Sequence, residues 1–485
     1  MNRHHAFAIV CFISLFPGGC TVGPKYVKPT VPMAPGFKEQ PPESFKESDG
    51  WKTAQPRDQA LRGNWWEIFG DPQLNALEEE VTLSNQDLKV AEARFREARA
   101  MIRFNRSAEF PTISTSPSIA SVRESANQPY FPQSQANNGT GYFTLPVDFS
   151  YEVDLWGRVR RTVSASREEA QASAADLQTA NLSLHAELAV DYFELRSADL
   201  QKQLLDDTVK AYTAALQLTQ SRFDGGAAPK SDVAQAQTQL DGGRVQDTDI
   251  TVMRAQFEHA IATLIGKPPA EFNITPEPQI ALHLPAIPVG VPASLLERRP
   301  DIAGRERRVA EANDQIGIAR AAFFPSLVLG ASGGFAGTSI ANWFNWPSRM
   351  WAVGPQLSQT IFDAGRRRAV SEGAIANYDG TVASYRQTTL TAFQEVEDNL
   401  AALRILENEA QQQREATTSA QESLQLFTNR YVGGVDNYLQ VITAQTVLLT
   451  NQRNDIDIER RRMDASVLLV KAIGGGWDTS QLPRL

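Results

Sequence analysis

The side chains that could perform chemistry are few in this chain and stand far apart. The sequence has 5 histidines and 2 cysteines. Beyond the N-terminal segment the histidines are His185, His259 and His283, which have neither metal-ligand spacing nor cysteine partners. No Gly-x-Ser-x-Gly elbow occurs. The sequence therefore predicts no enzyme, no metal site and no cofactor, and its net charge of -9 with mixed signs argues against nucleic acid as a partner.

The acidic side chains with a regular spacing are Asp148, Glu152 and Asp154. They stand in residues 143–155, where every odd position is apolar and every even position is polar or Pro. Successive side chains of a strand point to opposite faces, so one face is apolar and the other carries these carboxylates. An outer-membrane strand needs this arrangement, with lipid outside and water inside. The carboxylates are therefore expected to line a lumen, where an acidic lining would favour cations and where solvated polar residues are ordinary in any case.

An internal repeat positions this strand within a larger unit. The segment Arg222–Gly226 recurs as Arg430–Gly434, and Gly157-Arg158 recurs as Gly365-Arg366, both at an offset of 208 (430 − 222, 365 − 157). Each copy is predicted to run helix, strand, loop, strand, long helix, Gly-Gly turn, helix. The predicted strands are residues 112–122, 142–155, 326–334 and 351–361, and the predicted long helices are residues 158–222 and 366–430.

The predicted strands are too few to stand alone in a membrane. Strand edges exposed to lipid are not tolerated, and the smallest membrane barrels have about eight strands. A chain with four strands must therefore oligomerise, and either a dimer or a trimer would permit closure. Each long helix would span roughly 95 Å at 1.5 Å per residue and would extend the tube away from the membrane. No run of apolar residues is long enough for a helical membrane span.

The N-terminus is predicted to be a targeting segment. An apolar run from Ala6 to Phe16 follows Arg3 and is too short to cross a bilayer as a helix. Small residues precede Cys20, which predicts a lipoprotein signal peptide at residues 1–19 and acylation of Cys20. Ordinary cleavage nearby, with Cys20 as a spare thiol, is the alternative. The predicted divisions after the signal peptide are an extended Pro-rich arm at 20–63, a first repeat at 64–280 and a second repeat at 281–485.

Three motifs connect the chain to a known family. They are Cys20-Thr21-Val22-Gly23-Pro24-Lys25-Tyr26, the helix start Trp65-Trp66 with Phe69-Gly70-Asp71-Pro72, and Leu295-Leu296-Glu297-Arg298-Arg299-Pro300-Asp301-Ile302. Together with the Gly-Gly turns and the duplicated layout, they resemble the TolC-type outer-membrane factors, in particular the lipoprotein branch that serves RND-type multidrug efflux. The resemblance covers essentially the whole mature chain.

The resemblance implies an α+β membrane protein that assembles as a homotrimer. Four strands from each protomer would form a shared 12-stranded β-barrel in the outer membrane, continued by a long α-helical barrel through the periplasm. Such proteins are passive exit ducts for small molecules, anchored by lipid at the N-terminus. An inner-membrane RND-type pump delivers the cargo through a periplasmic adaptor protein. Protein secretion of type I, or metal-ion export, through the same architecture is the alternative function.

The resemblance also implies a gate at the periplasmic hairpin tips. Asp232 matches an acidic residue of the first tip and Tyr431 matches a tyrosine of the second. One hypothesis is that Asp232 accepts a hydrogen bond from Tyr431 and so holds the tips closed. The alternative is that Asp232 complements a helix N-terminus after Ser231 as N-cap, and that Tyr431 is a packing residue.

Two further gate candidates follow Tyr431. Leu439 matches a position where the family builds an apolar ring, although packing in a helical seam is the favoured interpretation. That seam is Val435, Leu439, Ile442, Thr446 and Leu449. Thr443 stands where the family often has an acidic residue lining the aperture, so no acidic ring is expected here. Asp436 is expected to cap the last helix.

The Gly-Gly turns themselves are candidates for contact with a partner. Gly225, Gly226, Gly433 and Gly434 are expected to allow tight tips, because glycine readily adopts a positive φ. Neither pair is followed by the Gly-Lys-Ser/Thr of a phosphate loop. The resemblance implies that an adaptor's helices dock on these tips.

Overall fold

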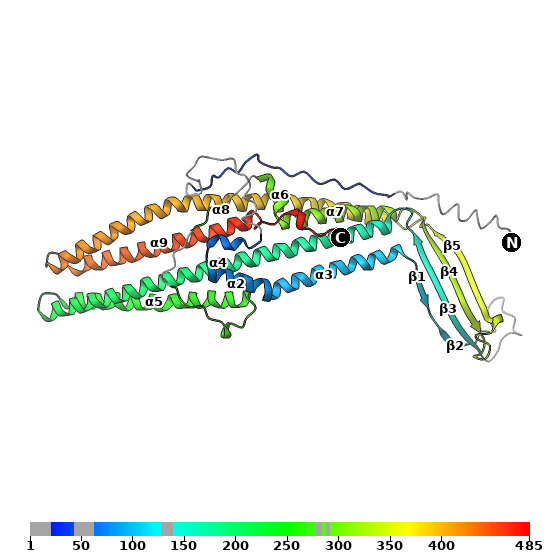
Figure 1. Ribbon diagram of the computed structural model, residues 1–485, viewed down its shortest axis with the longest axis horizontal. Helices are drawn as coiled ribbons and strands as arrows, with labels where there is room; N and C mark the ends of the chain where they lie inside the picture. The colour runs from blue at the N-terminus through cyan, green and yellow to red at the C-terminus, as the bar shows by residue number, and fades with distance from the viewer. Residues whose placement is uncertain are drawn as a thin grey trace.

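The computed structural model joins a bundle of long helices to an antiparallel sheet (Figure 1). The residues it describes are 21–42, 63–123, 125, 127, 139–277, 284–287 and 292–485. The predicted signal peptide and Cys20 lie outside these residues. In the part of the chain that is described, no helix is long and apolar enough to cross a membrane.

The sheet has the strand order β1-β3-β4-β5, with β2 also paired to β3. The strands are β1 (Thr112–Thr115), β2 (Ser118–Val122), β3 (Thr140–Val153), β4 (Ser326–Gly337) and β5 (Arg349–Ser358). β1 and β2 replace the single strand that was predicted over residues 112–122. Pro117 lies in the break between them, and it has no N–H to donate to a strand ladder. The other predicted strands form with ends that differ by a few residues.

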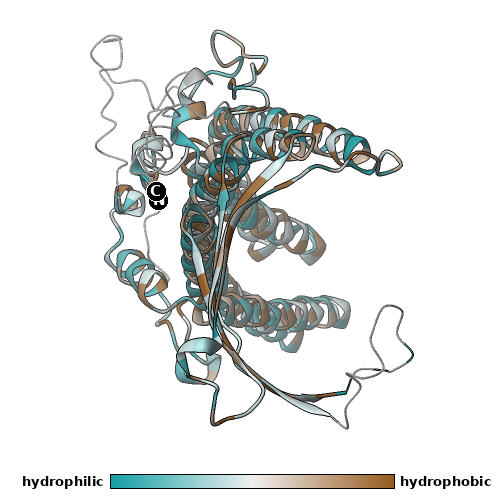
Figure 2. Ribbon diagram, turned by 90° about the vertical axis from the view of Figure 1, so that its right-hand side faces the viewer, coloured by the Kyte–Doolittle hydropathy of each residue, from teal (hydrophilic) through white to brown (hydrophobic). Residues whose placement is uncertain are grey.

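The register gathers apolar side chains on one face of the sheet, which curves in front of the helices (Figure 2). Phe149 on β3 pairs with Ala331 on β4, which pairs with Val353 on β5. Because directly paired residues share a face, the odd positions of β3 continue as one apolar face across β4 and β5. On the opposite face the even positions from Thr144 to Ser150 pair with Ala, Gly or Ser, and Glu152 pairs with Val328.

Two long hairpins extend from the sheet and turn at the opposite end of the molecule (Figure 1). They are α4 (Arg158–Asp224) with α5 (Lys230–Leu264), and α8 (Arg366–Val432) with α9 (Tyr438–Ala472). α4 and α8 each have 67 residues, which corresponds to about 100 Å at 1.5 Å per residue. Corresponding helices begin 208 residues apart (366 − 158, 438 − 230). The two long helices therefore start where they were predicted to start and end two residues later (224 − 222, 432 − 430).

Shorter helices complete the bundle. They are α2 (Pro72–Ser84), α3 (Gln86–Arg106), α6 (Leu295–Arg298) and α7 (Pro300–Ala321), with short 3-10 turns at Trp65–Phe69, Ser107–Glu109, Pro269–Glu271, Pro292–Ser294, Trp346–Ser348 and Thr479–Gln481. α3, α4, α7 and α8 lie side by side in that order, which is the order of the strands they join. The helical layer therefore continues the sheet. α2 begins at Pro72 as predicted, where the Asp71 carboxylate accepts hydrogen bonds from the next backbone N–H groups.

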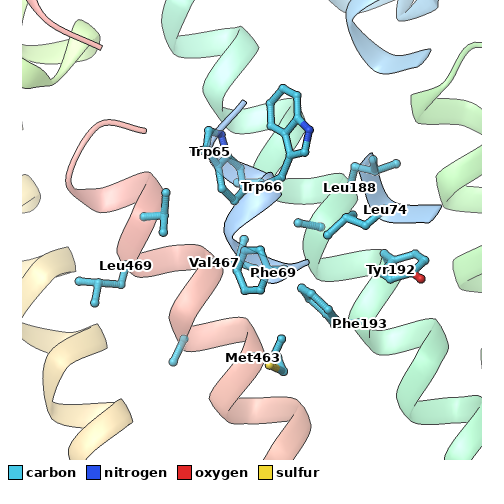
Figure 3. Packing of buried hydrophobic residues seen from close by; sticks show 14 of the residues in the cluster. Trp65, Trp66, Phe69, Leu74, Leu188, Tyr192, Phe193, Met463, Val467 and Leu469 are labelled. Atoms are coloured by element: carbon cyan, nitrogen blue, oxygen red, sulfur yellow. The ribbon is translucent and has the colours of Figure 1, made fainter. Parts of the chain in front are cut away.

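The largest hydrophobic cluster of the described residues surrounds the Trp65–Phe69 turn (Figure 3). Trp65, Trp66 and Phe69 insert between α4 and α9, where they meet Phe193 and Met463 among others. Fully burying a side chain of this size stabilises the fold by about 1.5–3 kcal/mol. The motif that opens the first repeat therefore acts as a wedge that fixes the two hairpins to each other.

The N-terminal residues 21–42 follow the bundle without helix or strand. The Pro24 carbonyl accepts a hydrogen bond from Arg161 Nη2 (3.1 Å). Farther along, the Glu397 carboxylate accepts hydrogen bonds from the backbone N–H groups of residues 38 and 39 (2.7 and 2.9 Å). A Cβ at Gly23 would lie 2.6 Å from the Gly317 Cα, so glycine is required where the arm crosses α7.

Candidate functional site

Each hairpin turns at its tip through the same backbone motif. After α4, Gly226 has φ +73°, and the N–H of Ala227 donates to the Arg222 carbonyl (2.7 Å). After α8, Gly434 has φ +76°, and the N–H of Val435 donates to the Arg430 carbonyl (2.9 Å). These bonds close each helix end in a Schellman motif.

The first glycine of each pair differs from the prediction. Gly225 and Gly433 have φ −80° and −73°, which any residue adopts. Only Gly226 and Gly434 therefore require glycine for their backbone conformation. Each turn therefore needs glycine at its second position only, and the backbone angles at the first position do not require it.

The predicted hydrogen bond between Asp232 and Tyr431 is not made in this protomer. Tyr431 is 3% exposed, and its hydroxyl is buried without a hydrogen-bond partner among the described residues. Its ring is held between Tyr438, at a centroid distance of 5.2 Å, and the guanidinium of Arg222. These contacts agree with the alternative, in which Tyr431 is a packing residue. Asp232 is also buried, and its carboxylate accepts a long hydrogen bond from the neighbouring Ser231 hydroxyl (3.5 Å).

Two expected helix caps are also wrong. α5 begins at Lys230 with Pro229 as its N-cap, so Ser231 lies inside the helix. α9 has Asn437 as its N-cap without a side-chain cap bond. Asp436 instead forms a two-point ion pair with Arg430, at 2.6 Å from Nε and 3.1 Å from Nη2.

Arg222 makes a polar contact between the two tips, beside an apolar cluster of Ala236 with Tyr431 and Tyr438. Its Nη1 donates a hydrogen bond to the Val432 carbonyl at the end of α8 (2.8 Å), and its guanidinium carbon lies 4.8 Å from the centre of the Tyr431 ring. In the sequence, Arg222 stands out only as part of the repeated motif. A comparison of the two copies carried a signal for it: Arg430 has Asp436 six residues later (436 − 430), whereas the position after Arg222 at the same spacing is Ala228.

The favoured seam packing of Leu439 is also wrong within the protomer. Leu439 is 50% exposed, whereas Tyr438, Val441 and Leu448 are buried. The buried stripe is thus shifted by one residue, or about 100° around the helix, from the predicted one. Thr443 is exposed as well, and its hydroxyl donates to the Leu439 carbonyl (2.9 Å). Both side chains remain candidates for lining an aperture.

The three predicted lumen carboxylates have different surroundings. Asp148 is half-buried on β3, between Ser114 on β1 and Ser332 on β4. Glu152 accepts hydrogen bonds from Arg158 Nε (2.9 Å) and Nη2 (2.6 Å).

Asp154 does not belong to the strand, because β3 ends at Val153. Its carboxylate accepts hydrogen bonds from the backbone N–H groups of Val159 (3.1 Å) and Arg160 (2.9 Å). It therefore satisfies donors at the start of α4 that have no partner within the helix. The alternating pattern continued in the sequence past the point where the backbone leaves the sheet.

The buried titratable groups of the bundle have structural surroundings. His185 Nδ1 lies 2.5 Å from Glu78 Oε2, and its ring stacks on Trp66 at 4.4 Å. Burial lowers the pKa of His185 to about 4 and raises that of Glu78. Elsewhere in the described part of the chain, no group of three or more His, Cys, Asp or Glu side chains could hold a metal ion. His185 is thus a core residue.

The apolar face of the sheet is open to the surroundings. Trp351 and Val353 on β5 are 80% and 72% exposed. Contiguous exposed apolar surface of this kind marks a contact with a membrane or a protein partner. The strands β5 on one side and β1 with β2 on the other are edges of the sheet, so their outer backbone groups are available to another chain.

Comparisons with known proteins point to one family. The family model for outer membrane efflux protein matches residues 77–267 and 291–475. The toluene efflux pump outer membrane protein TtgF of Pseudomonas putida is 34% identical over 477 residues, which cover 98% of each chain. The solved open state of the MtrE outer membrane channel of Neisseria gonorrhoeae aligns with 94% of this chain and 98% of its own, at 25% identity and a TM-score of 0.79. The CmeC outer membrane channel of Campylobacter jejuni shares the fold over 95% of this chain and 96% of its own, at 24% identity and a TM-score of 0.87.

Proposed function

We propose, from the premise that this chain belongs to the outer membrane efflux protein family, that its sheet and its hairpin tips are the two working ends of one exit duct. The chain is the outer-membrane channel of an efflux system, and it extends from the outer membrane into the periplasm. The proposal concerns its assembly, its partners, its gate and its cargo.

The observation that carries the proposal is the open sheet with one apolar face. Its two edges are β1 with β2 on one side and β5 on the other, and neither edge has a partner strand among the residues that the structure describes. Because β1 and β2 share one position beside β3, the sheet has four strand positions. Three copies joined edge to edge would close a barrel of twelve strands, with the exposed apolar face toward lipid. The layer of α3, α4, α7 and α8 would then continue this wall into the periplasm.

The N-terminal arm supports a lipid anchor at Cys20. Thr21 lies against Gly157, where a Cβ would come within 2.4 Å of the threonine Cγ2. Gly157 is the residue at which the sheet gives way to α4. An acyl chain on the residue before Thr21 would therefore start near the periplasmic surface of the membrane, beside the barrel that supplies the second attachment.

The partners and the gate are placed at the other end. A periplasmic adaptor would dock on the Gly-Gly tips, and an inner-membrane RND-type pump would supply the cargo and the energy. Tyr431, Asp232, Leu439 and Thr443 lie at or close to these tips and are the proposed gate residues. The cargo would be small organic molecules, because relatives are named for toluene and antibiotic efflux.

The test is the accumulation of a fluorescent cationic dye in a deletion strain, measured with killing curves for antibiotics, toluene and divalent metals. Accumulation of the dye and sensitivity to several unrelated compounds, both reversed by the wild-type gene, are expected. If only one metal has an effect, the cargo is metal ions. If no small molecule has an effect, small-molecule efflux is wrong, and export of a protein substrate is the function to measure.

A further inference from the structure

We propose that Arg222 is a positioning residue that latches the two hairpin tips of one protomer and so holds the duct closed. The inference rests on the proposed function, since a latch matters only if the tips close a duct. It assigns the link between the hairpins to a residue other than the Asp232–Tyr431 pair that the sequence suggested.

The first observation is a difference between two arginines at equivalent positions of the repeat. Arg430 is held inside its own hairpin by the two-point ion pair with Asp436. Arg222 has Ala228 at the corresponding position, and the nearby Asp224 carboxylate of its own hairpin accepts a hydrogen bond from Gln220 (2.8 Å). Its guanidinium crosses to the other hairpin, where it bonds to Val432 and stacks on Tyr431.

The second observation is the chemistry of the position that Arg222 reaches. Val432 is the last residue of α8, so its carbonyl has no donor within the helix. A guanidinium at a helix C-terminus satisfies such a carbonyl and complements the helix dipole. The Tyr431 ring offers its face to the same cation in a buried setting, where a cation–π contact is stronger than at an exposed site.

The third observation is that the latch is incomplete. Arg222 Nε and the Tyr431 hydroxyl are both buried without a hydrogen-bond partner among the residues that the structure describes. Buried polar atoms left unpaired cost free energy, and opening to water would release that cost. Separating the two tips would therefore let water form hydrogen bonds with both atoms.

The hairpins also meet beside Arg222, where Ala236 of the first hairpin packs with Tyr431 and Tyr438 of the second, and two further hydrogen bonds lie farther from the turns. Gln239 Nε2 donates to Thr446 Oγ1 (3.2 Å), and Arg453 Nη1 donates to Gln246 Oε1 (3.4 Å). Each hairpin is closed independently by its own Schellman bonds. Separation of the tips would therefore break the Arg222 contacts while each hairpin keeps its internal structure.

The experiment uses full-length protein in planar lipid bilayers, with Arg222→Gln as the main variant and Arg430→Gln as the matched control. Arg222→Gln removes the charge, the stacking cation and the fork, and we expect the fraction of time spent open to rise about tenfold, which corresponds to about 1.4 kcal/mol. Arg222→Lys keeps one charge and one donor, and an intermediate effect is expected. Arg430→Gln should change the open fraction much less, since its contacts remain within one hairpin.

A second variant tests the latch without changing Arg222. Ala228→Asp gives the first hairpin the carboxylate that the second one has. We expect Arg222 to turn back to its own hairpin and the channel to open as it does in Arg222→Gln. Retention of the trimer on a gel without heating serves as the folding control for every variant.

The outcomes separate the latch from the duct. If wild type restores dye efflux to the deletion strain but Arg222→Gln and Ala228→Asp leave the current unchanged, the latch is wrong and the duct stands. If Arg430→Gln opens the channel as much as Arg222→Gln does, the tips respond to any lost arginine, and the specific latch is wrong. If wild type does not restore efflux, and neither wild type nor any variant carries current, the proposed duct is wrong and the latch that rests on it is wrong too.

Discussion

The sheet end of this protein exposes large apolar side chains, whereas the tip of the second hairpin buries two tyrosines. On β5, Trp351 and Val353 project outward almost free of contact, while Tyr431 and Tyr438 are enclosed between the hairpins. The bonding differs in the same way. The sheet is held by a regular backbone ladder, with two edges that are unpaired among the described residues. The tips are held by side chains that reach from one hairpin to the other.

At the sheet end, the surrounding medium decides which way a side chain points. At the tips, packing against the other hairpin decides it. A strand face that meets lipid is specified residue by residue through its alternation, because a shift of one position turns every side chain to the other face. At a tip, the buried face of each helix is decided by the helix that packs against it. Substitutions should therefore be sensitive to the face of the strand at the sheet end, and to contact with the other hairpin at the tips.

The largest effect is expected from a charge on the apolar face of the sheet. Val353→Arg places a guanidinium in the middle of β5 on the face proposed to meet lipid, which costs about 2–4 kcal/mol near the bilayer midplane. Few assembled trimers should reach the outer membrane, measured by the unheated trimer band in membrane fractions.

The control is the adjacent residue on the same strand. Ala352 pairs with Ser332 and belongs to the opposite face, so Ala352→Arg should assemble at nearly the wild-type level. Equal losses for both variants would contradict the assignment of the two faces.

The sequence determined the regular parts of the molecule well. Glycine and arginine mark the start of both long helices, and the alternation over residues 143–153 matches β3. Each of these signals is local, because it depends on the backbone conformation of one element or on which of two faces meets water. The break at Pro117 was equally local and could have been predicted from its missing N–H.

The tip contacts could not be predicted in the same way. Leu439 and Tyr438 both lie on apolar stripes of α9, and the spacing alone does not say which stripe faces α4 and α8. Tyr431 and Asp232 both lie near Tyr438, but the position of the Tyr431 hydroxyl depends on how Arg222 and Tyr438 pack around the ring. Only the difference between Ala228 and Asp436 at equivalent positions was visible in the sequence as a sign of asymmetry.

A smaller effect is expected from the backbone of the tips. Gly226→Ala forces a residue with a Cβ into a left-handed conformation, which costs about 1–2 kcal/mol. No atom lies within 4 Å of that Cβ position, so the cost would come from the backbone alone. The amide of Ala227, which donates to the Arg222 carbonyl, should exchange with deuterium faster by roughly tenfold.

The neighbouring glycine provides the comparison. Gly225 has a negative φ, so Gly225→Ala should leave the exchange of the Ala227 amide close to that of wild type. Slower exchange in Gly226→Ala, or equally fast exchange in Gly225→Ala, would contradict the Schellman assignment. The same pair can be made at Gly434 and Gly433, where the result should repeat if the two tips share one backbone.

The smallest effect is expected in the pH dependence of stability, through Asp464 in the helical part. Burial raises the pKa of Asp464 from its ordinary 3.8 to about 7, helped by Glu194 and Asp457 and opposed by Arg460. The folded protein therefore holds this proton more tightly than the unfolded chain does. The contribution to stability is complete below about pH 4 and is lost as the pH rises through 7.

Asp464→Asn cannot lose that proton, so its thermal midpoint in detergent should fall less than that of wild type between pH 5 and about pH 8. The difference in unfolding free energy should be on the order of 1 kcal/mol. The sheet-face variant Ala352→Arg should follow the wild-type pH curve, since it lies far from this cluster along the fold. A pH curve for Asp464→Asn that is as steep as that of wild type would show that the acidic cluster relaxes when it ionises, and would remove this distinction between the two ends.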